Sequence, residues 1–255
     1  MNIVVGDLET SENNVNMLSV LEASFVIYDD RFQELESFHE SARIRPTCVP
    51  SLGACLTTGI RTDKLIGANN SSFELAVKIH NTLSKWGSYC TIGQNFIQFD
   101  NEALVRMFHK SLIPDIWILK KLPKKMMDTL FLARASKLID EKSLKCEVSS
   151  KGPDLFKLGS LCKMNGIKHE NSHSSAGDVH ATAELAKLIK GKVPKLWEQG
   201  LKIAHKSEAK KFLTPDGIIL LGMNTFYVPQ NVCVKLIKDN GYKLEKITKM
   251  KFNTS

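Results

Sequence analysis

The amino-acid sequence predicts an α/β fold, in which a mixed sheet is flanked by helices and followed by a small β-rich appendage. Three observations predict it. Of the 255 residues, 43% are hydrophobic, which is enough for one large domain and too many for a disordered or fibrous chain. Strand-like runs come first along the chain, and helical periodicities interleaved with another strand follow them. The composition becomes β-rich after residue 217, and this change predicts the appendage.

The first half of the chain alternates between strand-like runs and helical periodicities. In order, the expected elements are a strand at 3–5, two strands within 23–45, a helix at 73–86, a strand at 89–92 and a helix around 103–108. The Asp29-Asp30 pair predicts a turn between the two strands of 23–45. The helix at 73–86 repeats apolar residues at helical spacing, and Ser71 or Ser72 is expected to cap it.

The second half is expected to be mainly helical up to residue 212. Its predicted elements are a loop at 113–125, a helix at 127–138, an exposed loop at 140–153, helices at 155–164, 176–189 and 194–212, and strands at 218–228, 232–237 and 242–250. The turn sequence Thr214-Pro215-Asp216-Gly217 marks the change from helices to strands. We therefore expect one domain over residues 1–212 and a small basic β-rich appendage over residues 213–255.

The net charge of +8 is distributed unevenly along the chain. Residues 192–255 contain 12 lysines and no arginine against 5 acidic residues, whereas the first 191 residues carry 23 basic and 22 acidic side chains. A basic surface attracts polyanions such as nucleic acid. The other interpretation of this basic tail is a solvated surface without a partner, and charge alone favours that interpretation.

The cysteines and the start of the chain predict the cellular compartment of the protein. None of the six cysteines belongs to a Cys-x-x-Cys pair, which argues against a zinc ribbon or a thioredoxin-type site. Several, such as Cys90 and Cys233, lie in apolar stretches and indicate a reducing compartment. No leader precedes the first strand, and the longest apolar run, at 218–221, is too short to span a membrane. We therefore expect a cytoplasmic protein with no membrane partner.

Two acidic residues follow the first strand where a buried core would not accept them. The segment reads Gly6-Asp7-Leu8-Glu9-Thr10, and a strand period of two puts both acids on the face that Val5 occupies. Two like charges on a buried face destabilise a fold unless a divalent cation binds between them. The alternative is that the strand ends at Val5 and both acids lie in a solvated loop. For an Asp-x-Glu pair alone, this alternative is favoured.

Two further acids and a histidine stand out later in the chain. Asp100 follows the strand at 89–92, where a helix begins, and N-capping is a sufficient reason for an aspartate there. Asp178 lies on the apolar stripe of the helix at 176–189, where a carboxylate is unusual unless it caps the first turn or binds a ligand. His173 stands in the polar loop before that helix, and a lone loop histidine is usually a surface residue.

Together, the four carboxylates and the histidine match what phosphodiester hydrolysis by two metal ions requires. Mg²⁺ prefers oxygen ligands and keeps coordination positions for water and phosphate. Two ions held by shared carboxylates stabilise the attacking and the leaving oxygen of an in-line displacement. A neutral histidine near the attacking water can take its proton, because its pKa lies near working pH.

These motifs resemble those of the DEDDh-type 3′→5′ exonuclease superfamily, which includes polymerase proofreading domains. The three motifs are, in chain order, Asp7-Leu8-Glu9-Thr10, Gly93-x-Asn95-x-x-x-Phe99-Asp100, and His173 with Asp178 after four intervening residues. Residues 127–134, which read Met-Asp-Thr-Leu-Phe-Leu-Ala-Arg, also resemble a helix of this superfamily. The resemblance implies a ribonuclease H-like fold.

Within the superfamily, the sequence is most similar to the exodeoxyribonuclease I family of single-strand 3′→5′ DNases. The similarity includes residues 54–60, 92–95 and 161–169 and covers roughly residues 1–212. Ser175 stands where the family usually has alanine, and serine is small enough to keep the geometry. The family continues into an SH3-like domain and further helices that close a channel over the strand. Only about forty residues follow residue 212 here, so we expect hydrolysis without a complete channel.

The resemblance implies a role for each matched residue. The ligands of two Mg²⁺ ions, with Mn²⁺ as a substitute, would be Asp7, Glu9, Asp100 and Asp178. His173 would be the general base. The residues that would hold the 3′-terminal nucleotide by apolar contact and stacking are Leu8, Thr10, Thr58, Gly59, Ile60, Asn95 and Phe99. The implied reaction is 3′→5′ hydrolysis of single-stranded DNA to nucleoside 5′-monophosphates.

Three alternative functions stay open at this point. The first is a 3′→5′ exoribonuclease or oligonucleotidase, because discrimination of the 2′-OH depends on few contacts. The second is a proofreading nuclease that works with a polymerase, and a single-strand-binding protein is a further candidate partner. The third is a non-catalytic nucleic-acid-binding protein, which the presence of all four acids disfavours. If the basic tail holds substrate, truncation after Phe212 is expected to weaken strand binding and flatten its salt dependence.

Overall fold

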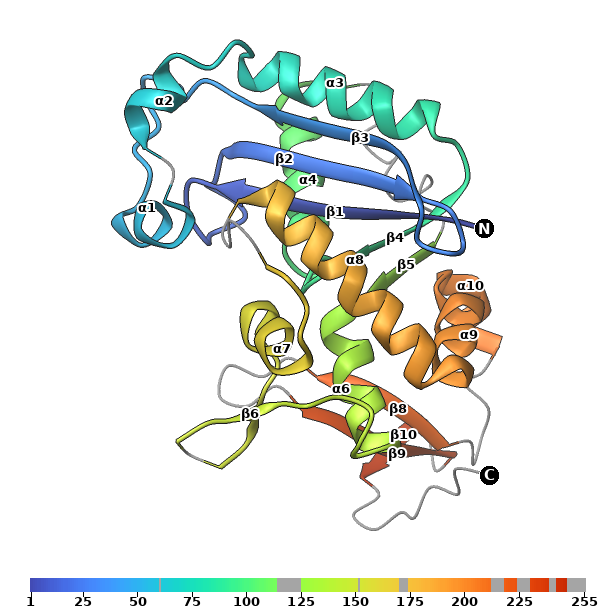
Figure 1. The fold of residues 1–255 in the computed structure, drawn as a ribbon. Helices are drawn as coiled ribbons and strands as arrows, with labels where there is room; N and C mark the ends of the chain where they lie inside the picture. The colour runs from blue at the N-terminus through green and yellow to red at the C-terminus, as the bar shows by residue number, and fades with distance from the viewer. Residues whose placement is uncertain are drawn as a thin grey trace.

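The centre of the structure is a five-stranded mixed sheet in the order β3-β2-β1-β4-β5 (Figure 1). The computed structural model describes residues 1–59, 61–113, 125–150, 152–169, 174–211, 218–223, 230–238 and 242–246. The strands are β1 (Asn2–Thr10), β2 (Val20–Tyr28), β3 (Glu34–Ser41), β4 (Tyr89–Gly93) and β5 (Lys125–Asp128). Strand β2 runs antiparallel to β1 and β3, whereas β4 runs parallel to β1 and β5. The predicted mixed α/β sheet is confirmed.

Helices cover both faces of this sheet (Figure 1). On one face, α8 (Ser175–Lys192) contacts β1 and β2, and α6 (Thr129–Ile139), α7 (Leu158–Asn165) and α9 (Pro194–Ile203) pack around it. On the other face lie α3 (Ser72–Lys85) and α4 (Asp100–Lys110). Short helices complete the chain: α1 (Leu52–Thr58) and α2 (Thr62–Ile66) follow β3, and α10 (Lys206–Lys211) follows α9.

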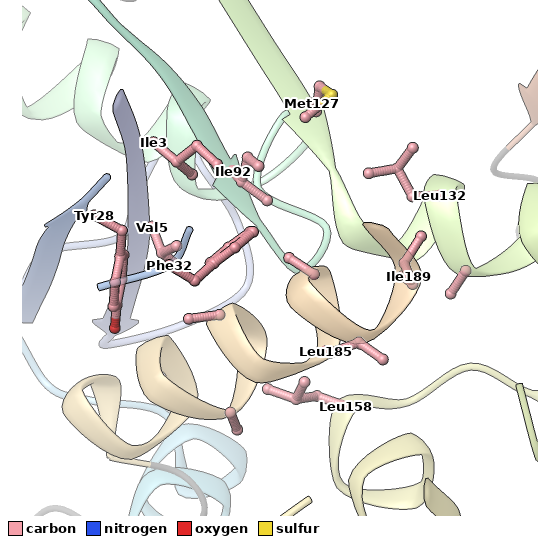
Figure 2. Packing of buried hydrophobic residues seen from close by; sticks show 14 of the residues in the cluster. Ile3, Val5, Tyr28, Phe32, Ile92, Met127, Leu132, Leu158, Leu185 and Ile189 are labelled. Atoms are coloured by element: carbon pink, nitrogen blue, oxygen red, sulfur yellow. The ribbon is translucent and has the colours of Figure 1, made fainter. Parts of the chain in front are cut away.

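Two hydrophobic clusters, one on each face of the sheet, stabilise this arrangement. On the α8 face, Ile3 and Val5 of β1 belong to one cluster with Leu185 and Ile189 of α8, and each of these side chains is at most 2% exposed (Figure 2). Because side chains alternate along a strand, Val4 points the other way, into the cluster that includes α3 and α4. Burial of one such side chain stabilises a fold by about 1.5–3 kcal/mol.

The ends of several helices follow from local sequence signals. Ser71 caps α3: its hydroxyl accepts a hydrogen bond from the Glu74 N–H, and the Glu74 carboxylate accepts one from the Ser71 N–H. The predicted cap of this helix is therefore confirmed. Gly59 ends α1 with a φ of 64°, a left-handed conformation that glycine adopts without steric cost.

The largest error of the sequence-based prediction is at the edge of the sheet. Met127 and Asp128 belong to β5 and not to a helix, because they pair with Ile92 and Gly93 of β4. Helix α6 therefore begins only at Thr129. Backbone pairing with an existing strand outweighs the helical spacing of the apolar residues in this segment.

Three smaller corrections concern the helices: one helix start, one division of a helix, and two short helices that the sequence pattern does not predict. Leu155 pairs within a two-stranded sheet of β6 (Glu147–Val148) and β7 (Asp154–Leu155), so α7 begins at residue 158. The helix predicted at 194–212 is divided into α9 and α10. The sequence pattern did not predict α1 and α2, which are only 7 and 5 residues long.

The C-terminal segment forms a separate antiparallel sheet in the order β10-β9-β8. Its strands are β8 (Ile218–Met223), β9 (Gln230–Lys238) and β10 (Tyr242–Lys246), and β9 contacts α6 (Figure 1). The predicted strand ends at 224–228 and 247–250 and most of the predicted loop at 113–125 lie outside the described residues. The division into a domain at 1–212 and an appendage at 213–255 stays a prediction.

Two features bear on the predicted location. Within the described ranges, no helix is both long and apolar enough to cross a membrane. The free cysteines among these residues are Cys48, Cys55, Cys90, Cys146 and Cys162. Burial raises the pKa of the Cys90 thiol to about 12, so this side chain packs as an unreactive core residue. The cytoplasmic location stays a prediction.

Candidate active site

Strand β1 carries Asp7 and Glu9 to one end of the sheet. The strand continues past both acids, because Asp7 pairs with Ser24 and Glu9 pairs with Glu22 in the antiparallel register of β2. The alternative in which the strand ends at Val5 is therefore wrong. Both carboxylates lie on the α8 side of the sheet, and Glu9 is only 9% exposed.

A tight turn after β4 places Asp100 beside β1. A Cβ atom at Gly93 would lie 2.7 Å from the backbone oxygen of Gly6, so the approach of β4 to β1 requires glycine there. Asp100 is the first residue of α4 and is buried. Its Oδ1 accepts a hydrogen bond of 3.0 Å from the Leu8 N–H. The N-cap interpretation of Asp100 is therefore wrong, because its carboxylate is directed at the neighbouring strand.

Helix α8 begins at the same end of the sheet, where β1 ends (Figure 1), and carries Asp178 in its first turn. Ser174 caps this helix: its hydroxyl accepts a hydrogen bond of 3.2 Å from the Gly177 N–H. Asp178 lies in the first turn, on the stripe whose members Ala181 and Leu185 are buried as expected. The cap and the stripe together fix where the Asp178 carboxylate meets strand β1.

The carboxylates form a cluster with strongly perturbed acidity. One oxygen from each of Asp7, Glu9 and Asp178 lies within 4.8 Å of the others. Burial, followed by the charges of Asp100 and Glu9, raises the pKa of Asp7 well above its ordinary value. Burial and the charges of Asp178 and Glu22 raise the pKa of Glu9 to about 8. Burial also raises the pKa of Asp100 to about 8, although its bond from the Leu8 N–H acts in the opposite direction.

The donor set of this cluster fits a divalent cation. All of its ligand atoms are carboxylate oxygens, the hard donors that Mg²⁺ and Mn²⁺ prefer. Carboxylates this close repel one another when ionised, and a bound dication removes that repulsion. Three of the four predicted metal ligands thus form one cluster, and the fourth, Asp100, lies close enough to raise the pKa of Asp7.

The histidine that contacts this cluster in the described structure is His169. Its Nε2 lies 2.6 Å from Oδ1 of Asp178, in a hydrogen bond whose donor depends on the tautomer. The His169 side chain is largely buried. His173, the predicted general base, lies outside the described residues, so its role stays a prediction.

The turn between β4 and α4 is held in place by Asp128. The carboxylate oxygens of Asp128 accept hydrogen bonds from the N–H groups of Asn95 at 2.9 Å, Ile97 at 3.2 Å and Leu130 at 3.0 Å. Asn95 adopts a left-handed conformation with a φ of 62°. Its Oδ1 is buried and has no hydrogen-bond partner among the described residues.

The other predicted nucleotide contacts lie around the same end of the sheet. Leu8 and Thr10 are on β1, Phe99 is half-buried before α4, Thr58 and Gly59 end α1, and Ile60 lies outside the described residues. Helix α1 is tied to the end of β1, because the Ser51 N–H donates to the Ser11 oxygen at 2.8 Å. The side chain of Leu8 is buried in the core. The substrate-binding roles of these residues stay predictions.

Sequence reasoning missed three polar residues that contact or flank the site. Glu22 of β2 pairs with Glu9 of β1, Asp128 anchors the turn after β4, and His169 contacts Asp178. A signal existed for Glu22, because it is the single acid in a mostly apolar strand. No local signal existed for His169, because its contact depends on where the chain passes after α7.

Known exonucleases match this chain in sequence over about two thirds of its length. The chain is 34% identical over 161 residues to exodeoxyribonuclease I of Buchnera aphidicola (subspecies Schizaphis graminum), and 30% over 151 residues to that of Escherichia coli. These matches cover 63% and 59% of this chain but only 33% and 31% of those proteins. The chain thus spans about a third of the length of these relatives. No protein-family model matches it.

Solved structures of exonuclease I share the fold. Escherichia coli exonuclease I in complex with a dT13 oligonucleotide aligns with a TM-score of 0.84 at 21% identity, over 92% of this chain and 52% of that one. Exonuclease I from Methylocaldum szegediense aligns with a TM-score of 0.83 over 92% of this chain and 51% of its own. The fold is therefore ribonuclease H-like, and it carries an acidic cluster at the end of its central strand. By sequence, the chain is homologous to the exonuclease domain of exodeoxyribonuclease I, and by structure it shares the fold of that enzyme.

Proposed function

We propose that this protein is a metal-dependent 3′→5′ exonuclease that hydrolyses single-stranded DNA to nucleoside 5′-monophosphates. The observation that supports the proposal most is the buried cluster of Asp7, Glu9 and Asp178, with Asp100 beside it. DNA is the preferred substrate class, because the relatives are named exodeoxyribonucleases and Escherichia coli exonuclease I has been solved with dT13 and dA16 oligonucleotides.

The proposed catalytic residues divide the work between metal binding and proton transfer. The four acids of the motifs would hold two Mg²⁺ or Mn²⁺ ions, which supply charge stabilisation to the attacking and leaving oxygens when bound. The Leu8 N–H orients Asp100, and His169 orients Asp178. His173 would accept the proton of the attacking water, because the Nε2 of His169 is already bonded to Asp178.

The proposed binding site for the 3′-terminal nucleotide is the turn between β4 and α4. The half-buried ring of Phe99 can pack against the base or sugar of this nucleotide, and Asn95 lies in the same turn. The end of α1, with Thr58 and Gly59, would close the other side. Apolar contact and stacking tolerate every base, which suits an enzyme that removes nucleotides in sequence.

A single-strand-binding protein is the protein partner that we propose first. One of the solved relatives is an ExoI/SSB-Ct complex, which aligns with a TM-score of 0.82 over 92% of this chain and 52% of that one. A polymerase is the second candidate. A cytoplasmic location would suit both partners.

A digestion of DNA and RNA side by side tests the proposed function. The purified protein is incubated with Mg²⁺ and 5′-labelled single strands of DNA and RNA that share one sequence. We expect stepwise shortening of the DNA from its 3′ end, faster than that of the RNA, and none in EDTA. An Asp7→Ala/Glu9→Ala variant is the matched control and is expected to leave both strands intact. The absence of shortening, or equal shortening by the variant, would contradict the proposal, and faster shortening of RNA would favour the exoribonuclease alternative.

A further inference from the structure

A buried polar network fastens the first residue of α8 to strand β2, next to the acidic cluster. Ser175 is the first residue of α8 and is fully buried. Its N–H and its hydroxyl both donate to Oε1 of Glu22, at 3.2 and 2.7 Å. The Ser175 hydroxyl also lies 2.7 Å from the Ser24 hydroxyl, and that hydroxyl lies 2.6 Å from Nδ1 of His39. The network therefore joins α8, β2 and β3.

All hydrogen bonds of this network can form together only if every donor points along the chain of residues from His39 toward Glu22. An ionised Glu22 carboxylate only accepts, so the single Ser175 hydroxyl proton goes to Glu22. The Ser24 hydroxyl then donates to Ser175, and Nδ1–H of His39 donates to Ser24. The chain of donors thus runs from His39 to Glu22. Hydrogen bonds to a charged carboxylate are roughly twice as strong as those between neutral groups.

Three members of this network lie close in the fold to carboxylates of the cluster. Glu22 pairs with Glu9 across the sheet, and Ser24 pairs with Asp7. Ser175 lies three residues before Asp178 in the first turn of α8. Oε1 of Glu22 is occupied by Ser175, and Glu22 is not among the three carboxylates that come within 4.8 Å of one another. Glu22 is therefore placed to hold the helix rather than to bind the ion.

We propose that Glu22 and Ser175 are positioning residues that fix Asp178 relative to Asp7 and Glu9, and thereby set the affinity of the cluster for divalent cations. The inference rests on the proposed function only in treating the cluster as a metal site. Without the Glu22–Ser175 pair, a buried donor or acceptor loses its partner, and the first turn of α8 loses its attachment to β2. Residues that orient metal ligands commonly contribute about 10-fold to 100-fold in metal affinity.

Binding of Mn²⁺ to the DNA-free protein, followed by electron paramagnetic resonance, tests this inference. We expect Glu22→Ala and Ser175→Ala each to weaken Mn²⁺ binding by about 10-fold. The double variant is expected to bind no more weakly than Glu22→Ala, because that change already removes both hydrogen bonds between Glu22 and Ser175. Glu36→Ala is the matched control, since Glu36 is a partly exposed acid of β3 that pairs with Lys85. Wild-type Mn²⁺ affinity in both single variants, or additive losses in the double variant, would overturn the inference.

A Glu22→Gln variant separates the hydrogen bond from the charge. The amide oxygen of glutamine still accepts from Ser175, so we expect an affinity within about 3-fold of the wild type. A loss as large as that of Glu22→Ala would mean that Glu22 acts through its charge, and would overturn the positioning role. If circular dichroism shows that Glu22→Ala does not fold, Ser175→Ala and Glu22→Gln are compared instead. Ser175→Ala keeps the bond from the backbone N–H of residue 175, and Glu22→Gln keeps an acceptor oxygen for Ser175.

The same measurements separate this inference from the proposed function. If the wild type binds Mn²⁺ and the alanine variants bind it weakly, the positioning role holds even when no DNA is hydrolysed. If the wild type hydrolyses DNA and the variants bind Mn²⁺ as it does, the proposed function holds and the positioning role fails. A wild type that binds no Mn²⁺ overturns the inference outright.

Discussion

The two halves of strand β1 share one backbone geometry and one face of the sheet, yet they act on stability in opposite directions. In the first half, Ile3 and Val5 are buried against α8 and stabilise the fold. In the second half, Asp7 and Glu9 continue the same face, and burial raises the pKa of both carboxyl groups. A regular strand that changes from apolar to acidic side chains without leaving the core indicates that a ligand compensates for the buried charge.

Neutralising one acid of the second half is expected to have the largest effect. Glu9→Gln keeps the shape of the side chain but removes a charge from the cluster, so we expect hydrolysis to slow by on the order of 10³-fold. In EDTA at pH 8.5 the same variant is expected to unfold at a higher urea concentration than the wild type, because it carries one fewer buried charge. Rates on labelled DNA and urea unfolding curves measure the two effects.

The stability of Glu9→Gln tests directly whether the acidic half of β1 differs from the apolar half. At pH 5.5 the Glu9 carboxyl group is largely protonated, since its pKa is raised to about 8, and the two proteins are then expected to have similar stability. A variant that is both active and less stable at pH 8.5 would mean that the acidic half is an ordinary part of the core.

Truncating the apolar half is expected to affect stability and not the site. Ile3→Ala removes a side chain that is only 2% exposed, and such changes lower the free energy of unfolding by about 2–5 kcal/mol. Because Ile3 lies at the far end of the strand, the affinity for Mn²⁺ is expected to stay at the wild-type value. Urea denaturation and Mn²⁺ titration check both parts. A loss of metal affinity in the folded variant would show that the two halves do not act separately.

The pH dependence of stability distinguishes the same two halves without substitution. The folded protein holds the Glu9 and Asp100 protons up to about pH 8, whereas the unfolded chain releases them near the ordinary values of 4.5 and 3.8. Between these limits the folded state binds more protons, so the stability of the metal-free protein falls as pH rises toward about 8. Mg²⁺ is expected to reverse this fall, because it binds the ionised cluster.

Urea unfolding at pH 5.5, 7 and 8.5, in EDTA and in Mg²⁺, measures this dependence. Ile3→Ala should keep the slope of the wild type at a lower stability, whereas Glu9→Gln should flatten the slope. Equal stability at all three pH values in EDTA would contradict the raised pKa values of the cluster.

The difference between the halves also explains what the sequence could predict. The apolar face of β1 and the stripe of α8 follow from local periodicity, and the structure confirms both. The positions of Asp7 and Glu9 required one more condition, which is that the strand continues past Val5. That continuation depends on pairing with β2, a contact between distant segments, so the local pattern left both alternatives open.

Contacts between distant segments also account for what was missed. The local interpretation of Asp100 as a cap failed, because its partner is the Leu8 N–H, 92 residues away in the chain. The local pattern predicts a helix at Asp128, because nothing in its immediate sequence shows that this segment pairs with β4. The contact of His169 with Asp178 depends likewise on tertiary structure. Residue types at fixed spacing thus predict which chemistry is present, and tertiary contacts decide which atoms hold it in place.

The smallest effect is expected for the basic strands β9 and β10, whose charge is opposite to that of the acidic cluster. This effect concerns the binding of single-stranded DNA. The sequence of these two strands contains four lysines, Lys235, Lys238, Lys243 and Lys246. If these lysines attract the DNA substrate, their replacement by glutamine should weaken binding of single-stranded DNA by a few fold. Each lost phosphate contact should lower the slope of log affinity against log salt by about 0.7.

The measurement is fluorescence anisotropy of labelled single-stranded DNA in the Glu9→Gln background with EDTA, so that no hydrolysis occurs. In a lysine variant that keeps Glu9, Mn²⁺ binding should not change, because the cluster consists of the carboxylates of Asp7, Glu9 and Asp178. An unchanged salt slope would assign these lysines to a solvated surface, and the attraction of substrate would then depend on the residues around the acidic end of β1.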